Sequence, residues 1–206
     1  MSWFDATLFT STFVTLIVIL DPPGAIPIFL ALTGPLTPRQ KAAAARRASL
    51  VALGVIASFA VFGQRILDYL HISLPALQGA GGLLLLVVAL QLLTGAETEQ
   101  HADAGVNVAL VPLGTPLLAG PGAIVATMLA VQDADDTGGL VAVAAALVAA
   151  ILVVFLTFRF AAPLARVLKD SGIVLLTRIA GLLLSAIAVQ MMADAVIAFA
   201  KGAGST

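Results

Sequence analysis

The sequence contains no cysteine and only two histidines, and charged residues make up just 10% of it. Without cysteine the chain forms no disulfide and no thiolate metal site. His71 and His101 fall in separate expected loops with no helical histidine partner, so we expect no metal site and no cofactor. The net charge is −1 and no basic stripe is present, which argues against a nucleic-acid partner.

Apolar residues are abundant instead. Hydrophobic residues make up 61% of the chain and the mean hydropathy is +1.11, whereas soluble domains carry about 25% charged residues. Six apolar runs come near the length of about 20 residues that a bilayer requires. We therefore expect one all-α, multi-pass membrane domain over residues 1–206, in contact with lipid, with spans at about 8–32, 48–67, 74–94, 108–131, 140–160 and 173–199.

The basic residues predict how the chain is oriented. Eight of the ten lie in two segments that can face the same side, the loop after the first span and the loop region expected after the fifth. Because loops rich in lysine and arginine stay in the cytoplasm, both termini are expected outside it. The eight residues are Arg39, Lys41, Arg46, Arg47, Arg159, Arg166, Lys169 and Arg178. Thr37-Pro38-Arg39-Gln40 also reads as a capping box, so the second helix should begin before the membrane.

The first apolar run is interrupted by Asp21-Pro22-Pro23-Gly24. Two prolines remove backbone donors and glycine loosens the chain, so a helix cannot continue through this stretch. Asp followed by Pro is also typical of a helix start, with Asp as the N-cap. An aspartate at the centre of a membrane helix costs roughly 2.5–3.5 kcal/mol and usually has a function. We expect two half-helices that meet near the membrane midplane.

Two sequence matches indicate an internal repeat. Pro-Gly-Ala-Ile occurs at 23–26 and again at 121–124, and the stretch from Gly82 to Gln91 aligns with the stretch from Gly181 to Gln190, 99 residues later. The alternative explanation is the low complexity of Leu-, Ala- and Gly-rich helices. Repeats at about 5–95 and 108–200 would each contain three spans, and an odd number inverts the second copy, as in many secondary transporters.

The second copy of the interruption runs from Thr115 to Gly122 and includes Pro116, Gly120 and Pro121. We expect it to break the fourth span as Asp21–Gly24 breaks the first. Two helix N-termini would then approach the membrane centre from opposite sides. Each would offer backbone N–H groups and a partial positive charge to a small zwitterionic or anionic solute.

The chain resembles the MarC family of bacterial and archaeal membrane proteins over nearly its whole length. The residues that carry the resemblance are Asp21-Pro22-x-Gly24-x-x-Pro27-x-Phe29, Pro116-Leu117-x-Ala119-Gly120-Pro121-Gly122 and Arg178-x-x-Gly181-Leu182-Leu183. The resemblance implies six spans in a bacterial or archaeal cytoplasmic membrane and a place in the LysE-type exporter superfamily. Some members are described as transporters of small neutral amino acids such as glycine and alanine.

Asp21 is the first candidate for a substrate-binding residue, because its carboxylate can hold an ammonium group or carry a coupled proton. The alternative is that it only caps the broken helix. Gly24, Gly120 and Gly122 would admit a ligand close to the backbone, or would only allow helices to pack closely. We expect Pro22 and Pro121 chiefly to set the breaks.

Three further candidates are polar residues within apolar helices. Gln91 and Gln190 occupy equivalent repeat positions and either line the solute path or form hydrogen bonds between helices. Arg178 either binds a solute carboxylate or reaches the cytoplasmic headgroups. Asp194, on the same helix face as Gln190, is expected at the outer interface.

These residues favour a secondary transporter of a small solute, most simply a small neutral amino acid, with export and proton coupling as open features. A channel for a small ion or solute, or a membrane partner of another complex that transports nothing itself, would use the same residues. An enzyme is not expected, because the sequence has no nucleophile–base arrangement and no nucleotide-binding loop. The sequence leaves the substrate and the oligomeric state open.

Overall fold

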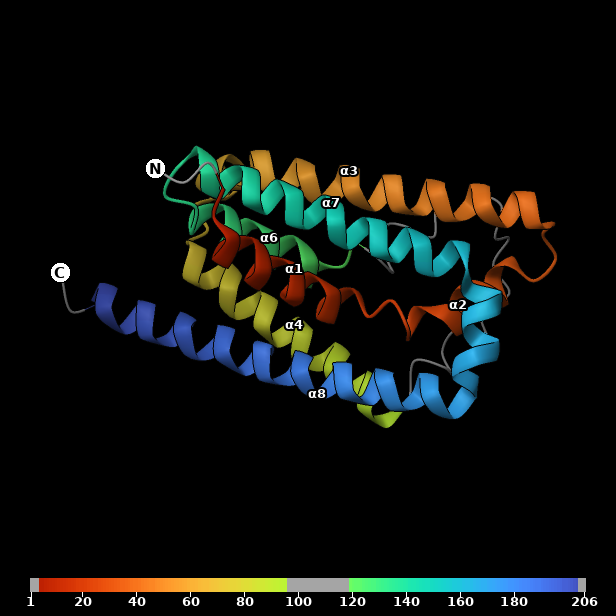
Figure 1. Cartoon of the computed structure of the whole chain (residues 1–206). Coiled ribbons are helices and arrows are strands. Elements are labelled where there is room, and N and C mark those ends of the chain that lie inside the picture. Colours follow the sequence, from red (N-terminus) through yellow and green to blue (C-terminus); the bar gives the residue numbers. More distant parts are fainter. Residues whose placement is uncertain (1–3, 96–118, 204–206) are drawn as a thin grey trace.

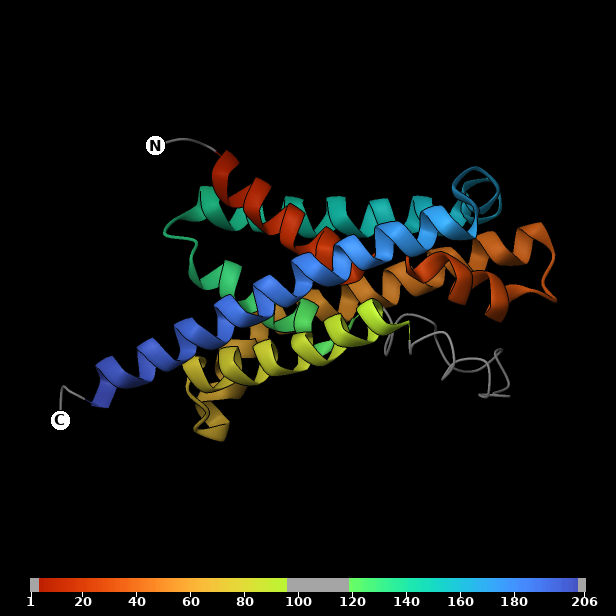
Figure 2. The same ribbon diagram turned by 90° about the horizontal axis from the view of Figure 1, so that it is seen from below.

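The computed structural model describes residues 4–95 and 119–203, and in these ranges every regular element is an α-helix (Figure 1). Most of the helices lie side by side as an elongated bundle (Figures 1 and 2). The helices are α1 (Ala6–Leu20), α2 (Ala25–Thr33), α3 (Pro38–Leu70), α4 (Leu74–Thr94), α6 (Pro121–Gln132), α7 (Thr137–Arg159) and α8 (Ala161–Ala203).

Four helices are long and apolar enough to cross a membrane, namely α3, α4, α7 and α8, and α1 and α6 are shorter apolar helices. The expectation of a multi-pass helical membrane protein is confirmed to that extent. The first part of the expected fourth span lies outside the described residues, so only its second half is observed, as α6.

The first apolar run is broken where the sequence predicts. Helix α1 ends at Leu20 and α2 begins at Ala25, with a turn between them. Asp21 is the C-cap of α1 and has left-handed dihedral angles, φ 36° and ψ 65°. Aspartate tolerates this conformation better than most residues. The two prolines and the left-handed Asp21 together redirect the chain.

Helix α3 begins with the predicted capping box. The Thr37 N–H donates to Gln40 Oε1 at 2.8 Å, and the Gln40 N–H donates to Thr37 Oγ1 at 3.4 Å. These two bonds satisfy donors at the helix start, where none has a partner within the helix. The cap starts α3 ahead of its apolar stretch, and the whole helix is 33 residues long.

The region after the fifth span was expected to be a loop, and this expectation is wrong. Residues 161–168 are helical and turn at Lys169, whose φ of 54° and ψ of 170° are not helical (Figure 1). The side chains of Leu164, Ala165 and Leu168 pack against the core, while Arg166 is exposed. Apolar residues at this spacing form one helix face, and Arg166 lies on the other.

Two groups of buried apolar side chains form the core. The first joins α1, α2, α3, α7 and the first part of α8 (Ala161 and Ile173), with Ala119 just before α6 and Ala123 in its first turn. The second joins α4, α6 and the later part of α8. Phe29 of α2 stacks on Phe158 of α7 with 4.5 Å between ring centroids, in the first group. Ile19 packs against both groups. The end of α1 therefore lies where the two groups meet.

Helices α4 and α8 pack against each other and run in opposite directions (Figures 1 and 2). A Cβ atom added at Gly82 would lie 2.8 Å from the carbonyl oxygen of Ala188, and one added at Gly181 would lie 3.2 Å from that of Ala89. Gly82 and Gly181 are 99 residues apart, as are Ala89 and Ala188. Each helix thus presents its own glycine and alanine, at equivalent repeat positions, to the other helix.

Candidate functional site

The interruption of the first span places a carboxylate inside the protein. Asp21 is only 7% exposed. Its backbone N–H donates to the carbonyl oxygen of Ile17 at 3.1 Å and so closes α1. Its Oδ1 accepts from the N–H of Gly24 at 3.3 Å, and its carbonyl oxygen accepts from that of Ala25 at 3.1 Å. Asp21 therefore ends α1 and caps α2 with one residue.

The cap leaves few backbone donors at the start of α2. Pro22 and Pro23 have no N–H, and the N–H of Ile26 donates to the carbonyl oxygen of Pro23 at 3.2 Å. The N–H groups of Gly24 and Ala25 are already accepted by Asp21. A solute at this break would therefore meet the Asp21 carboxylate rather than a row of backbone amides.

Helix α8 contributes a hydroxyl group to the same place. A Cβ atom at Gly24 would collide with Asp21 Oδ2 and would lie 2.9 Å from Oγ1 of Thr177. This Thr177 oxygen is buried and has no hydrogen-bond partner among the described residues. Sequence reasoning selected Arg178 and overlooked Thr177. The available signal was a hydroxyl group one position before that arginine in an apolar run.

Replacing Gly24 by alanine is expected to destabilise the protein because the new methyl group displaces the Asp21 carboxylate or the Thr177 hydroxyl. Forced repacking of this kind costs about 1–3 kcal/mol. Gly54→Ala is the matched control, since a Cβ atom there meets nothing within 4 Å. The melting temperatures of both purified variants would test this. Equal behaviour of the two variants would contradict the packing described here.

The second interruption starts its helix differently from the first and carries no carboxylate. Gly120 is the N-cap of α6, with Pro121 at the first helical position and no side-chain cap bond. The N–H groups of Ala123 and Ile124 donate to the Gly120 carbonyl oxygen at 3.1 and 3.3 Å. Ala119 occupies the position 98 residues after Asp21. One break therefore carries a carboxylate, and the other begins a helix without a side-chain cap.

The two interruptions lie next to each other. A Cβ atom at Gly122, in the first turn of α6, would lie 3.5 Å from Cγ2 of Ile19, in the last turn of α1. The same atom would collide with the side chain of Leu85. Gly122 is buried, as is Asp21. The part of the predicted second break from Thr115 to Leu118 lies outside the described residues.

The remaining candidate residues lie at different distances from the breaks. Arg178 is exposed beside Thr177, and Gln91 is half-buried on α4, at the level where Leu92 packs on Gly181. Gln190 is exposed and donates through Nε2 to Asp194 Oδ1 at 2.8 Å. It follows Thr177 by 13 residues, which is about 20 Å along a helix. The structure therefore does not bring Gln190 to the breaks. No group of three or more potential metal ligands occurs in the described part of the chain.

Four helices have the length and apolar composition to span a membrane, and the first apolar run is split into two half-helices around a buried carboxylate. These features define a multi-pass integral membrane protein. More narrowly, the chain belongs to the MarC family of integral membrane proteins, whose sequence pattern matches residues 6–199.

Relatives match over almost their whole length. The chain is 36% identical to a UPF0056 membrane protein of Methanocaldococcus jannaschii, with 93% of this chain and 97% of the relative covered. It is 36% identical to one from Archaeoglobus fulgidus, covering 91% and 92%, and 30% identical to YhcE of Escherichia coli, covering 93% of each. These names specify a membrane protein and no solute. No solved structure matches the chain.

Proposed function

We propose that this chain is a secondary transporter of a small solute, most simply a neutral amino acid such as glycine or alanine. The observation that carries the proposal is the buried Asp21 carboxylate in an interrupted span, with the start of a second half-helix packed beside it. Broken helices that meet inside a membrane protein are a usual setting for transporter binding sites.

A zwitterion needs one site for its ammonium group and another for its carboxylate, and each break would supply one of them. The Asp21 carboxylate would hold the ammonium group, with the Thr177 hydroxyl beside it. The solute carboxylate would face the start of α6, where no side chain caps the helix and the dipole favours negative charge. Pro22 and Pro121 hold the two turns, and Asp21 is also the group that would carry a coupled proton. Resemblance to the exporter superfamily favours outward transport.

The reciprocal crossing of α4 and α8 supports six spans arranged as two inverted repeats. Two equivalent pairs, Gly82 with Ala188 and Gly181 with Ala89, are what a twofold axis between the halves would produce. With both termini outside the cytoplasm and three spans in each half, the second half would be inverted relative to the first. The twofold axis would then lie in the membrane plane. Rocking of one half against the other would then expose the breaks to each side in turn.

Counterflow in proteoliposomes tests the proposal. Purified protein is reconstituted with unlabelled glycine or alanine inside, and labelled amino acid is added outside. We expect saturable, transient accumulation of label above its equilibrium level. A carrier that releases unlabelled solute outside binds labelled solute there and brings it back inside. Flux without saturation or counterflow would indicate a channel instead. No flux for any small amino acid would contradict the proposed substrate class, and a stoichiometric protein partner would then favour a non-transporting role.

A further inference from the structure

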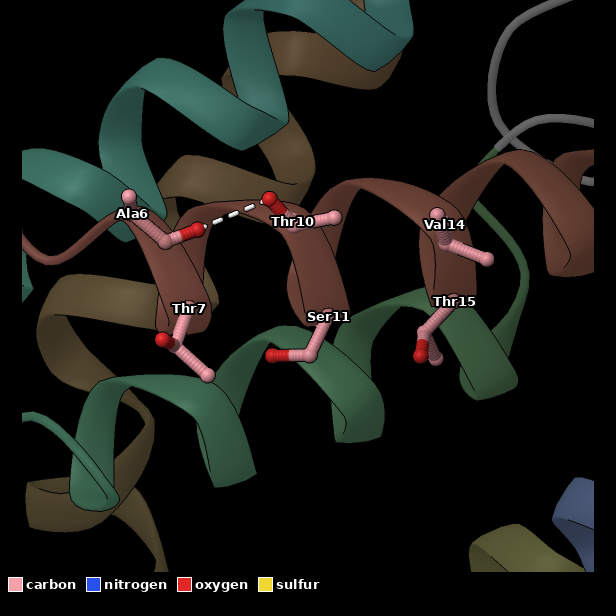
Figure 3. A pocket seen from close by; sticks show the side chains of 6 residues that line it. All are labelled: Ala6, Thr7, Thr10, Ser11, Val14 and Thr15. Atoms are coloured by element: carbon pink, nitrogen blue, oxygen red, sulfur yellow. Dashed lines mark hydrogen bonds between the residues drawn. The ribbon is translucent and has the colours of Figure 1, made fainter.

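The outer half of α1 carries an unusual set of side chains for an apolar helix. Five of the nine residues from position 7 to position 15 bear hydroxyl groups, and of these only Thr12 is buried. An open groove of about 660 Å³ runs along this part of the helix. Its lining residues are Ala6, Thr7, Thr10, Ser11, Val14 and Thr15 (Figure 3).

The hydroxyl groups form a continuous strip. Thr7, Ser11 and Thr15 are spaced four residues apart, and Figure 3 shows their side chains on one side of α1. Thr10 lies along the same groove and donates to the Ala6 carbonyl oxygen at 2.8 Å, while Ser11 donates to that of Leu8 at 3.1 Å. A hydroxyl that donates in this way keeps acceptor lone pairs available for water.

Other open helix faces differ in chemistry. The exposed residues of α7 include Val141, Val148 and Leu152, which suit contact with lipid. Helix α7 begins at the same end of the bundle as α1, so the two faces can be compared at matched depth (Figure 1). Of these two, α1 offers hydroxyl groups and α7 offers hydrocarbon. This contrast favours water over lipid along the groove of α1.

The groove also leads toward the break. Asp21 follows Thr10 by 11 residues, which is three helical turns and about 16 Å. Thr10 and Val14, which line the groove, therefore lie on the side of α1 that leads to Asp21, with the half-buried Ile17 and Val18 between Val14 and the carboxylate.

We infer that the groove along α1 is a water-filled access path from the outer surface to the Asp21 break, and that small polar solutes enter or leave along it. This inference rests on the proposed function, since it assumes that Asp21 receives a solute. It also requires that the α1 face between Thr7 and Thr15 be hydrated in the membrane.

Thiol labelling tests the path, because the chain has no cysteine of its own. Single variants Ser11→Cys and Thr15→Cys, with Val141→Cys and Val148→Cys as lipid-facing controls, are reconstituted in vesicles. A charged, membrane-impermeant methanethiosulfonate is added to one side at a time. Only a hydrated thiol ionises and reacts. We expect the two α1 variants to react from the outer side at least tenfold faster than the controls.

Reaction at the control rate, or only from the cytoplasmic side, would overturn the inference. Labelling of denatured protein confirms that every variant carries its thiol, and Thr10→Cys replaces a variant that fails to fold. The two proposals fail separately. Fast labelling without amino acid counterflow would leave a hydrated groove and remove the proposed function, whereas counterflow without labelling would remove only this path.

Discussion

Replacing Asp21 by asparagine is expected to lower the proposed amino acid transport about tenfold to a hundredfold while the protein stays folded. Asparagine keeps an oxygen that can accept the Gly24 N–H bond, so the cap of α2 survives. It removes the charge that would hold an ammonium group. A hydrogen bond to a charged group contributes about 1.5–3 kcal/mol, and 1.4 kcal/mol corresponds to a factor of ten.

Initial uptake rates and melting temperatures of the purified variant would measure this effect. Asp194→Asn is the matched control, because it also removes an acid from an apolar helix, at a residue hydrogen-bonded to Gln190 in the C-terminal part of α8. We expect Asp194→Asn to transport like wild type. If both variants lost transport equally, or if Asp21→Asn lost none, the role of the Asp21 charge would be refuted.

The alanine variant of Gly82 is expected to be the least stable of the glycine variants on α4 and α8. Its Cβ atom would lie 2.8 Å from a backbone oxygen of α8, which cannot rotate away, so the helices must separate. Overpacking of this kind costs about 1–3 kcal/mol. Gly181→Ala should destabilise by a smaller amount, because its nearest neighbours lie at 3.0 and 3.2 Å.

Thermal unfolding in detergent would rank these variants. Gly54→Ala, on α3, has no neighbour within 4 Å of the new atom and replaces a poor helix former, so its melting temperature should stay equal or rise. A Gly82→Ala protein as stable as the Gly54→Ala protein would show that α4 and α8 do not cross as closely as described.

The interruption and the helix starts were predictable because local chemistry determines them. Prolines and glycine at 22–24 exclude a continuous helix in any surroundings, and Thr37 with Gln40 forms a capping box from adjacent residues. The equivalence of Gly82 and Gly181 was predicted from sequence matches alone. Their reciprocal contact could be seen only once both helices were placed.

Features that depend on distant segments were missed or only partly predicted. The approach of Thr177 to Gly24 joins residues more than 150 positions apart, and no local pattern indicates it. The helix over 161–168 could not be predicted from its short sequence alone, because its apolar face at Leu164 and Leu168 is defined only by packing against the core. Backbone amides were expected at both breaks, yet Asp21 itself accepts the N–H groups of Gly24 and Ala25.

The proposed mechanism depends most directly on a solute ammonium group at Asp21. Ligand-induced shifts in melting temperature would test this, since a ligand that binds only the native state raises its stability. Purified wild type and Asp21→Asn would each be titrated with alanine and with lactate, which has a hydroxyl in place of the ammonium. We predict that wild type is stabilised by alanine at concentrations at least tenfold below those needed for lactate, and that Asp21→Asn loses this preference. Equal shifts for both ligands in wild type, or an unchanged preference in Asp21→Asn, would contradict the proposed site.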